Sequence, residues 1–246
     1  MRLSRIKGIF VTGTDTAVGK TAVTGCLARF LNDKGLAVVT QKWVQTGERG
    51  NFSSDAKTHM EFMGRGKSDF RNYLFRISPY VFKLAASPHL ASRIENRPVK
   101  EEEIIENFRM LSNRFDFVLA EGAGGPLVPF NEKGLMIDIA RKLKLPVLVV
   151  VANRLGAINQ ALMAIEAIRH RKMEILGLVF NNPKKENVLI LQDNPSVVRQ
   201  LGKEAVLGVL PRRENRKALY REFISIGNGI WEKISSRITL PGSKKT

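Results

Sequence analysis

The sequence has very little cysteine and no long apolar segment, and each absence excludes a class of protein. Cys26 is the single cysteine among 246 residues, which excludes an intramolecular disulfide framework and favours a reducing compartment. The longest strongly apolar run, Val147–Ala152, is too short to span a bilayer. His59, His89 and His170 lie far apart without zinc-site spacing. A G-x-S-x-G motif is also missing, which argues against a serine hydrolase.

Acidic residues are scarce relative to basic ones. The chain has 40 Lys and Arg against 23 Asp and Glu, a formal net charge of +17. Such a balance raises nucleic acids, membranes and anionic small molecules as partners. The basic residues occur in small separate groups, and no aromatic residues are regularly interleaved to stack on bases. The pattern is therefore typical of a solvated basic surface, and we expect no specific nucleic acid and no membrane among the partners.

Nothing in the sequence divides the chain, since no internal repeat or low-complexity linker is visible. Hydrophobic residues make up 43% and charged residues 26%, which is ordinary for a globular protein. We expect one domain over residues 1–238 and a flexible tail over residues 239–246. The basic N-terminus is followed by an apolar stretch that Asp15 interrupts, so we expect no signal peptide and a cytoplasmic protein.

Apolar β-branched runs alternate with helical patterns along the chain. Strands are expected at residues 8–11, 37–41, 115–120, 146–152, 175–180 and 206–210. Helices are expected at residues 20–32, 55–63, 84–94, 99–113, 136–142, 157–171, 195–201 and 218–234. This alternation predicts an α/β fold with a mostly parallel central sheet and helices on both faces. Ligands in such sheets bind beyond the carboxyl ends of the strands, so the residues that follow each strand matter most.

The loop after the first expected strand matches the phosphate-binding pattern G-x-x-x-x-G-K-T. It reads Gly13, Thr14, Asp15, Thr16, Ala17, Val18, Gly19, Lys20, Thr21. In a strand–loop–helix context, the backbone N–H groups of such a loop point at phosphate oxygens. Lys20 then reaches the β- and γ-phosphates, and the Thr21 hydroxyl binds Mg²⁺. The sequence therefore predicts a P-loop NTPase domain that binds ATP with Mg²⁺.

Two acidic residues are candidates for the metal. Glu121 follows the expected strand at residues 115–120 and would face the phosphates, although a solvated Glu in a tight turn is the alternative. Asp55 follows Ser53 and Ser54 at an expected helix start, where spacing alone favours a helix cap over a metal ligand.

Three further positions at strand ends allow two interpretations each. Lys42 could hold a developing anion, although a strand-end lysine is more often solvated. Asn181 could bind the N6/N7 edge of adenine, or belong to a simple turn with Asn182 and Pro183. The segment Gly156–Asn159 opens a helix, where free N–H groups could hold a substrate carboxylate or form an ordinary cap.

Taken in order, these motifs resemble those of the dethiobiotin synthetase family, from Ile9 to Pro211. The matching segments are Val11–Thr16 with Val18–Thr21, Gln41-Lys42, Thr46-Gly47, Ser54–Ala56, Ser87–His89, Glu121–Gly125 with Val128-Pro129, Leu155–Asn159, and Asn181. The resemblance implies an ATP-dependent cyclo-ligase of biotin synthesis that uses Mg²⁺. Its substrates would be 7,8-diaminononanoate, ATP and CO2 from bicarbonate, and its products dethiobiotin, ADP and phosphate.

The resemblance also implies a role for each site residue. Thr21, Asp55 and Glu121 would hold Mg²⁺, which reverses the preference that spacing alone gives for Asp55. Lys20 and Lys42 would act on the carbamate and the transferring phosphoryl group. The other implied contacts are Gly13–Thr21 and Asn181 with the nucleotide, and Thr16 and Thr46 with the substrate. The family is homodimeric, and Gly156, Ala157 and Asn159 would bind the substrate carboxylate across the interface.

Two residues depart from the family pattern. Ala17 stands where many members carry Glu, which removes a polar group from the site. Trp43 stands where Pro often follows the lysine, and is expected to add bulk near Lys42. The alternative functions are a P-loop amidoligase of the cobyrinic acid diamide synthase type and an ATP-switched partitioning ATPase. The latter usually has an early lysine in the loop, where this chain has Thr14.

Overall fold

The computed structural model describes residues 5–182 and 184–238, so the expected tail at residues 239–246 lies outside the described residues. A six-stranded sheet forms the centre of the molecule, in the order β2-β5-β1-β6-β7-β8. Its strands are β1 (Gly8–Gly13), β2 (Val38–Lys42), β5 (Phe117–Glu121), β6 (Val147–Ala152), β7 (Ile175–Asn181) and β8 (Val206–Leu210). Every neighbouring pair is parallel. The expected α/β class and parallel sheet are therefore confirmed.

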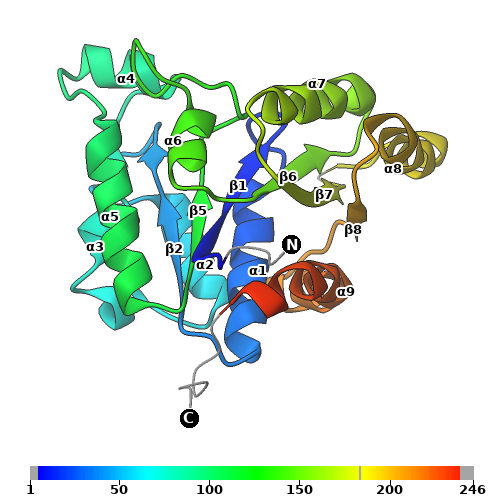
Figure 1. Cartoon of the computed structure of the whole chain (residues 1–246), viewed down its shortest axis with the longest axis horizontal. Helices are drawn as coiled ribbons and strands as arrows, with labels where there is room; N and C mark the ends of the chain where they lie inside the picture. The colour runs from blue at the N-terminus through cyan, green and yellow to red at the C-terminus, as the bar shows by residue number, and fades with distance from the viewer. Residues whose placement is uncertain (1–4, 183, 239–246) are drawn as a thin grey trace.

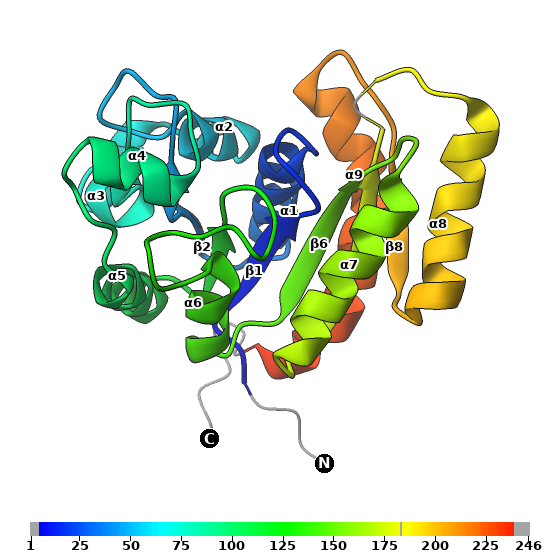
Figure 2. The same cartoon turned by 90° about the horizontal axis from the view of Figure 1, so that it is seen from above.

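Helices cover both faces of this sheet (Figures 1 and 2). They are α1 (Lys20–Asp33), α2 (Ser54–Phe62), α3 (Leu74–Ile77), α4 (Pro88–Ile94), α5 (Glu101–Arg114), α6 (Met136–Lys142), α7 (Ala157–His170), α8 (Val188–Gly202) and α9 (Arg216–Ile234). Short 3₁₀ turns occupy Lys67–Phe70 and Ser235–Arg237, and β3 (Val44–Gln45) pairs with β4 (Tyr80–Val81). Because strand residues alternate between faces, Phe10 packs in the core under α5, α6 and α7, whereas Ile9 and Val11 pack in the core under α1 and α9.

Two of the expected helices have different bounds in the structure. The helix expected at residues 84–94 begins only at Pro88, because Ser87 is extended and proline suits the first helical position. The helix expected at residues 195–201 is longer: α8 begins at Val188, and the Asn187 side chain caps it by accepting from the Leu189 N–H. Pro195 lies inside this helix and is not its first residue.

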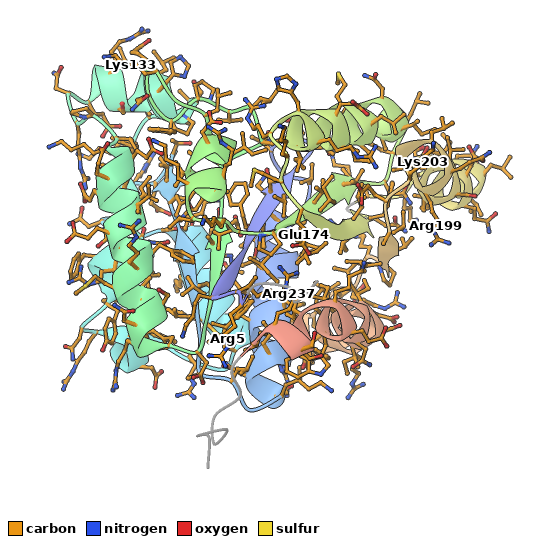
Figure 3. All side chains as sticks on the ribbon, viewed as in Figure 1. Arg5, Lys133, Glu174, Arg199, Lys203 and Arg237 are labelled. Carbon is orange, nitrogen blue, oxygen red and sulfur yellow. The ribbon has the colours of Figure 1, made fainter. Side chains whose placement is uncertain are left out.

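The 3₁₀ turn that follows α9 is tied to the sheet by an ion pair between buried Arg237 and half-exposed Glu174. The Arg237 guanidinium donates to both carboxylate oxygens of Glu174, at 2.6 and 2.9 Å, just before β7 begins (Figure 3). Other basic side chains lie far from this ion pair: Figure 3 places Lys133 at the end of the molecule that holds α4, Arg199 on α8 and Lys203 directly after α8. No helix in the described part of the chain is long and apolar enough to cross a membrane. The expected absence of a nucleic-acid partner stays a prediction.

Candidate active site

The phosphate-binding loop joins β1 to α1 and depends on glycine at its last turn. Gly19 caps α1 in the left-handed region, with φ of 101°. A Cβ atom at Gly19 would lie 2.2 Å from the Asn181 side-chain nitrogen, so both the backbone angle and the close approach require glycine. Within the described residues, the N–H groups of Ala17, Val18 and Gly19 donate no hydrogen bond. These groups are therefore available for the phosphate oxygens that such loops bind.

Lys20 lies in the first turn of α1 and is only 6% exposed. Its Nζ donates to the Asp15 carbonyl oxygen at 2.8 Å, so the ammonium group folds over its own loop. Burial, followed by the nearby positive charge of Lys42, lowers the pKa of Lys20 to about 8. A bound phosphate would place negative charge beside the buried ammonium group of Lys20 and so favour its protonated form.

Glu121 ends β5 with its carboxylate fully buried. Its Oε1 accepts from the Lys42 ammonium at 2.7 Å and from the Thr21 hydroxyl at 3.4 Å, while its Oε2 lies 2.8 Å from Nε2 of His59. Burial alone would raise the pKa of Glu121, but the charges and hydrogen bonds of Lys42 and His59 hold it well below its usual range. Glu121 is therefore an ionised buried group, and the alternative of a solvated turn residue is wrong.

Lys42 lies between two carboxylates at the same edge of the sheet. Strand pairing places Lys42 beside Glu121 in register, and the Lys42 ammonium is also 2.7 Å from Oδ2 of Asp55. Burial would lower the pKa of Lys42, but Glu121 and Asp55 raise it above its usual value. The cap of α2 is Ser53, whose side chain accepts from the Ala56 N–H at 3.0 Å. Asp55 is therefore free of the capping role that spacing favoured, and Lys42 is not solvated.

A cavity of about 490 Å³ joins these groups at the carboxyl ends of β1, β2 and β5. The expected site residues among its lining are Thr16, Ala17, Gly19, Lys20, Thr21, Lys42, Thr46, Asp55 and Glu121. No group of three His, Cys, Asp or Glu side chains in the described residues could hold a metal unaided. Two carboxylates and a hydroxyl are nevertheless hard oxygen donors of the kind that Mg²⁺ takes together with substrate phosphates. The donor set fits nucleotide-bound Mg²⁺.

Eight expected site residues do not line this cavity: Gly13, Thr14, Asp15 and Val18 of the loop, and Asn181, Gly156, Ala157 and Asn159. Asn181 ends β7, and its side-chain NH₂ donates to the Val18 carbonyl at 2.9 Å, which links β7 to the phosphate-binding loop. Gly156 caps α7 in the left-handed region with φ of 87°, Ala157 is buried, and Asn159 is exposed. Within one chain, therefore, the segment Gly156–Asn159 does not meet the phosphate site.

The two departures from the family pattern have different consequences. Ala17 lines the cavity, and also lines a second hollow of about 280 Å³ toward the ends of β6 and β7. Trp43 does not line either: it is fully buried, stacks on Phe10 at 4.7 Å, and donates from its indole nitrogen to Gln41. The bulk of Trp43 therefore lies in the core against Phe10 and outside the cavity that Lys42 lines.

His59 is a site residue that the sequence analysis missed. It appeared only as one of three isolated histidines without zinc spacing, yet its ring touches the Glu121 carboxylate. The available signal was its position four residues after Asp55 in an expected helix, which places the two side chains on one face.

Known proteins match this chain over most of its length. A family model described as an AAA domain matches residues 7–218. ATP-dependent dethiobiotin synthetase BioD 2 of Haemophilus influenzae is 35% identical over 186 residues, covering 76% of this chain and 96% of that protein. ATP-dependent dethiobiotin synthetase BioD of Lysinibacillus sphaericus is 35% identical over 235 residues, covering 94% and 97%. The corresponding protein of Akkermansia muciniphila is 37% identical over 205 residues, covering 83% and 92%.

Solved structures support the fold at a greater distance. The cell division ATPase MinD of Pyrococcus furiosus aligns with a TM-score of 0.57 at 16% identity, covering 93% of this chain and 100% of that one. The ParA protein of pNOB8, bound to nonspecific DNA, aligns with a TM-score of 0.56 at 13% identity, covering 96% and 98%. At such low identity these likenesses concern the α/β fold alone.

Proposed function

The chain belongs to the dethiobiotin synthetase family, and from this premise we propose that it closes the ureido ring of dethiobiotin from 7,8-diaminononanoate, CO2 and ATP. The position of Lys42 is the observation that best supports placing this reaction in the phosphate cavity. Its ammonium contacts Asp55 and Glu121 in the same cavity as the P-loop lysine, Lys20. Two lysines beside a phosphate loop suit a reaction in which an anionic carbamate attacks a phosphoryl group.

The reaction has three steps, each of which needs positioning more than covalent help from the protein. One substrate amine adds to CO2 and loses a proton, which gives a carbamate. A carbamate oxygen attacks the γ-phosphorus of ATP, ADP leaves, and a carbamic–phosphoric anhydride forms. The second amine attacks the carbamate carbonyl carbon and expels phosphate, which closes the five-membered ring. Lys20 and Lys42 would neutralise the charge on the carbamate and on the transferring phosphoryl group.

The Thr21 hydroxyl and the carboxylates of Asp55 and Glu121 would hold Mg²⁺. When bound, Mg²⁺ would neutralise charge on the phosphates of ATP. The carboxylate oxygens that contact Lys42 are the ones suited to this cation. A cation at these oxygens would compete with Lys42, and the Lys42 ammonium would then be available to the carbamate.

The remaining contacts divide between nucleotide and diamine. The loop Gly13–Lys20 would bind the phosphates of ATP through its free N–H groups. The side-chain oxygen of Asn181 would accept from the adenine amino group, since its NH₂ is already used by Val18. Thr16 and Thr46, which both line the cavity, would contact the diamine.

We further propose a homodimer that shares its active sites. The segment Gly156–Asn159 does not line the phosphate cavity of its own chain, and large apolar side chains beside it are solvent-exposed. Leu155, just before α7, is 79% exposed, and Met163 on α7 is 56% exposed. A second copy would cover them and place the α7 N-terminus against a substrate carboxylate.

A reaction that consumes ATP and bicarbonate also fits the expected cytoplasmic location.

The assignment is tested by following the carbon that enters the ring. The purified protein is incubated with ATP, Mg²⁺, 7,8-diaminononanoate and ¹³C-bicarbonate, and the product is analysed by mass spectrometry. We expect dethiobiotin with ¹³C in the ureido carbonyl, together with one ADP per ring closed. ATP turnover without labelled dethiobiotin would contradict the proposal and favour another P-loop reaction. A folded Lys20→Ala protein serves as the control for contaminating enzyme.

A further inference from the structure

His59 is a fully buried histidine to which the proposed reaction assigns no role. It lies on α2, four residues after Asp55, and its Nε2 is 2.8 Å from Oε2 of Glu121. It is not among the residues that line the phosphate cavity. His59 therefore reaches Glu121 from behind, where it cannot touch the nucleotide or the diamine.

The two oxygens of the Glu121 carboxylate have separate sets of partners. Oε1 meets Lys42 and Thr21, which both line the cavity, whereas Oε2 meets His59. An ionised carboxylate only accepts hydrogen bonds, so Nε2 of His59 carries the proton in the hydrogen bond between His59 and Glu121. Within the described residues Nδ1 of His59 has no hydrogen-bond partner. The hydrogen-bonding capacity of this buried ring is thus spent on Glu121 alone.

We propose that His59 is a positioning residue for the metal: by holding Oε2, it fixes the rotation of the Glu121 carboxylate so that Oε1 faces the cavity. The inference rests on the proposed role of Glu121 as a Mg²⁺ ligand. The terminal torsion of a glutamate is soft, so a carboxylate needs a partner to define its plane. Lys42 is a poor candidate for this task, because a metal at Oε1 would compete with it. His59 contacts the other oxygen and can keep its hydrogen bond while the metal binds.

A matched pair of substitutions separates positioning from filling of the core. The pair is His59→Gln and His59→Met: the two new side chains have similar length, but only glutamine has a nitrogen donor that reaches Oε2 of Glu121. His59→Asn also carries an amide, but its side chain is too short for the nitrogen to reach Oε2, so this variant controls for polarity. Mn²⁺ serves as the metal probe, measured by electron paramagnetic resonance in the presence of a non-hydrolysable ATP analogue. Binding of the analogue without metal is measured in parallel, and thermal melting in EDTA reports folding.

We expect His59→Met and His59→Asn to weaken Mn²⁺ binding about 10-fold, and His59→Gln to stay within about 3-fold of the wild type. Metal-free binding of the ATP analogue should not change in any of the three. Wild-type Mn²⁺ affinity in His59→Met, or equal weakening in Gln and Asn variants, would overturn the proposal. If His59→Met does not fold, the comparison of the two amide variants decides alone.

A Glu121→Gln protein separates failure of this inference from failure of the proposed metal site. If Glu121→Gln loses Mn²⁺ affinity while the His59 variants retain it, the metal site stands and the positioning role of His59 is wrong. If Glu121→Gln binds Mn²⁺ like the wild type, Glu121 is not a ligand, and the positioning role is overturned with it.

Discussion

The two halves of the carboxyl edge of the sheet are built differently. At the ends of β2 and β5, the charged groups are buried and already in contact: Lys42 is 4% exposed and Glu121 is fully buried. At the end of β6, the start of α7 lies open, and Leu155 is 79% exposed. The groups that are proposed to neutralise phosphate charge are thus organised within one chain. The segment proposed to bind the substrate carboxylate is left open for a second copy.

The charged half depends most on its P-loop lysine. Lys20→Ala should reduce ring closure by about 1,000-fold or more, because it removes the P-loop charge that is proposed to neutralise the phosphates. The measurement is dethiobiotin formed per enzyme, with circular dichroism to show that the protein is folded. Activity near that of the wild type in a folded variant would remove the P-loop from the mechanism.

The carboxylates of the charged half should respond to Mg²⁺ concentration. Asp55→Asn and Glu121→Gln keep the side-chain shape but lose the charge, so half-saturation by Mg²⁺ should rise about 100-fold in each. The measurement is a Mg²⁺ titration of activity at saturating ATP. A titration unchanged in both variants would show that these residues serve only as partners of Lys42.

The open half should respond to the diamine and not to ATP. Asn159→Asp places a negative charge near the proposed carboxylate site, and should raise KM for the diamine about 10-fold, equivalent to ~1.4 kcal/mol. Asn159 is exposed, so folding should not suffer. Steady-state kinetics with each substrate varied in turn tests this expectation. An equal rise in KM for ATP would place the segment at the nucleotide instead.

Trp43 provides a control for the comparison of the two halves, because it lies in the hydrophobic core and outside the cavity. Trp43→Phe removes the hydrogen bond to Gln41 and leaves the buried Oε1 of Gln41 without that donor, so the free energy of unfolding should fall by about 1–3 kcal/mol. KM for the diamine should be unchanged, because Trp43 packs on Phe10 and not in the cavity. Urea unfolding and steady-state kinetics check the two parts. A changed KM would restore the expectation of bulk near Lys42.

Periodicity predicted the sheet well, because its buried strands are nearly continuous apolar runs. The six strands of the sheet were all anticipated, with small shifts at their ends. The short pair β3 and β4 and the helix Leu74–Ile77 were missed, since two to four residues are too few to show a period. The early start of α8 was missed: the expected helix began at Pro195, whereas Asn187 caps the observed helix eight residues before it.

The motifs predicted the phosphate loop, but the contacts between side chains required the fold. Spacing alone left Asp55 as a cap, and only the structure shows that Ser53 fills that role. The proximity of Lys42 and Glu121 follows from the register of β2 and β5, which a sequence does not state. His59 was missed because its partner is far away along the chain.

The central claim is that the charged half is complete in one chain while the open half is shared. It is tested by mixing the folded Lys20→Ala and Asn159→Asp proteins at a diamine concentration well below KM. Native mass spectrometry with two tags of different mass confirms subunit exchange. In a shared site, each heterodimer has one intact centre, so the mixture should reach about a quarter of wild-type activity. A monomeric protein, or a mixture that stays at the mean of the two parents after exchange, would contradict the account.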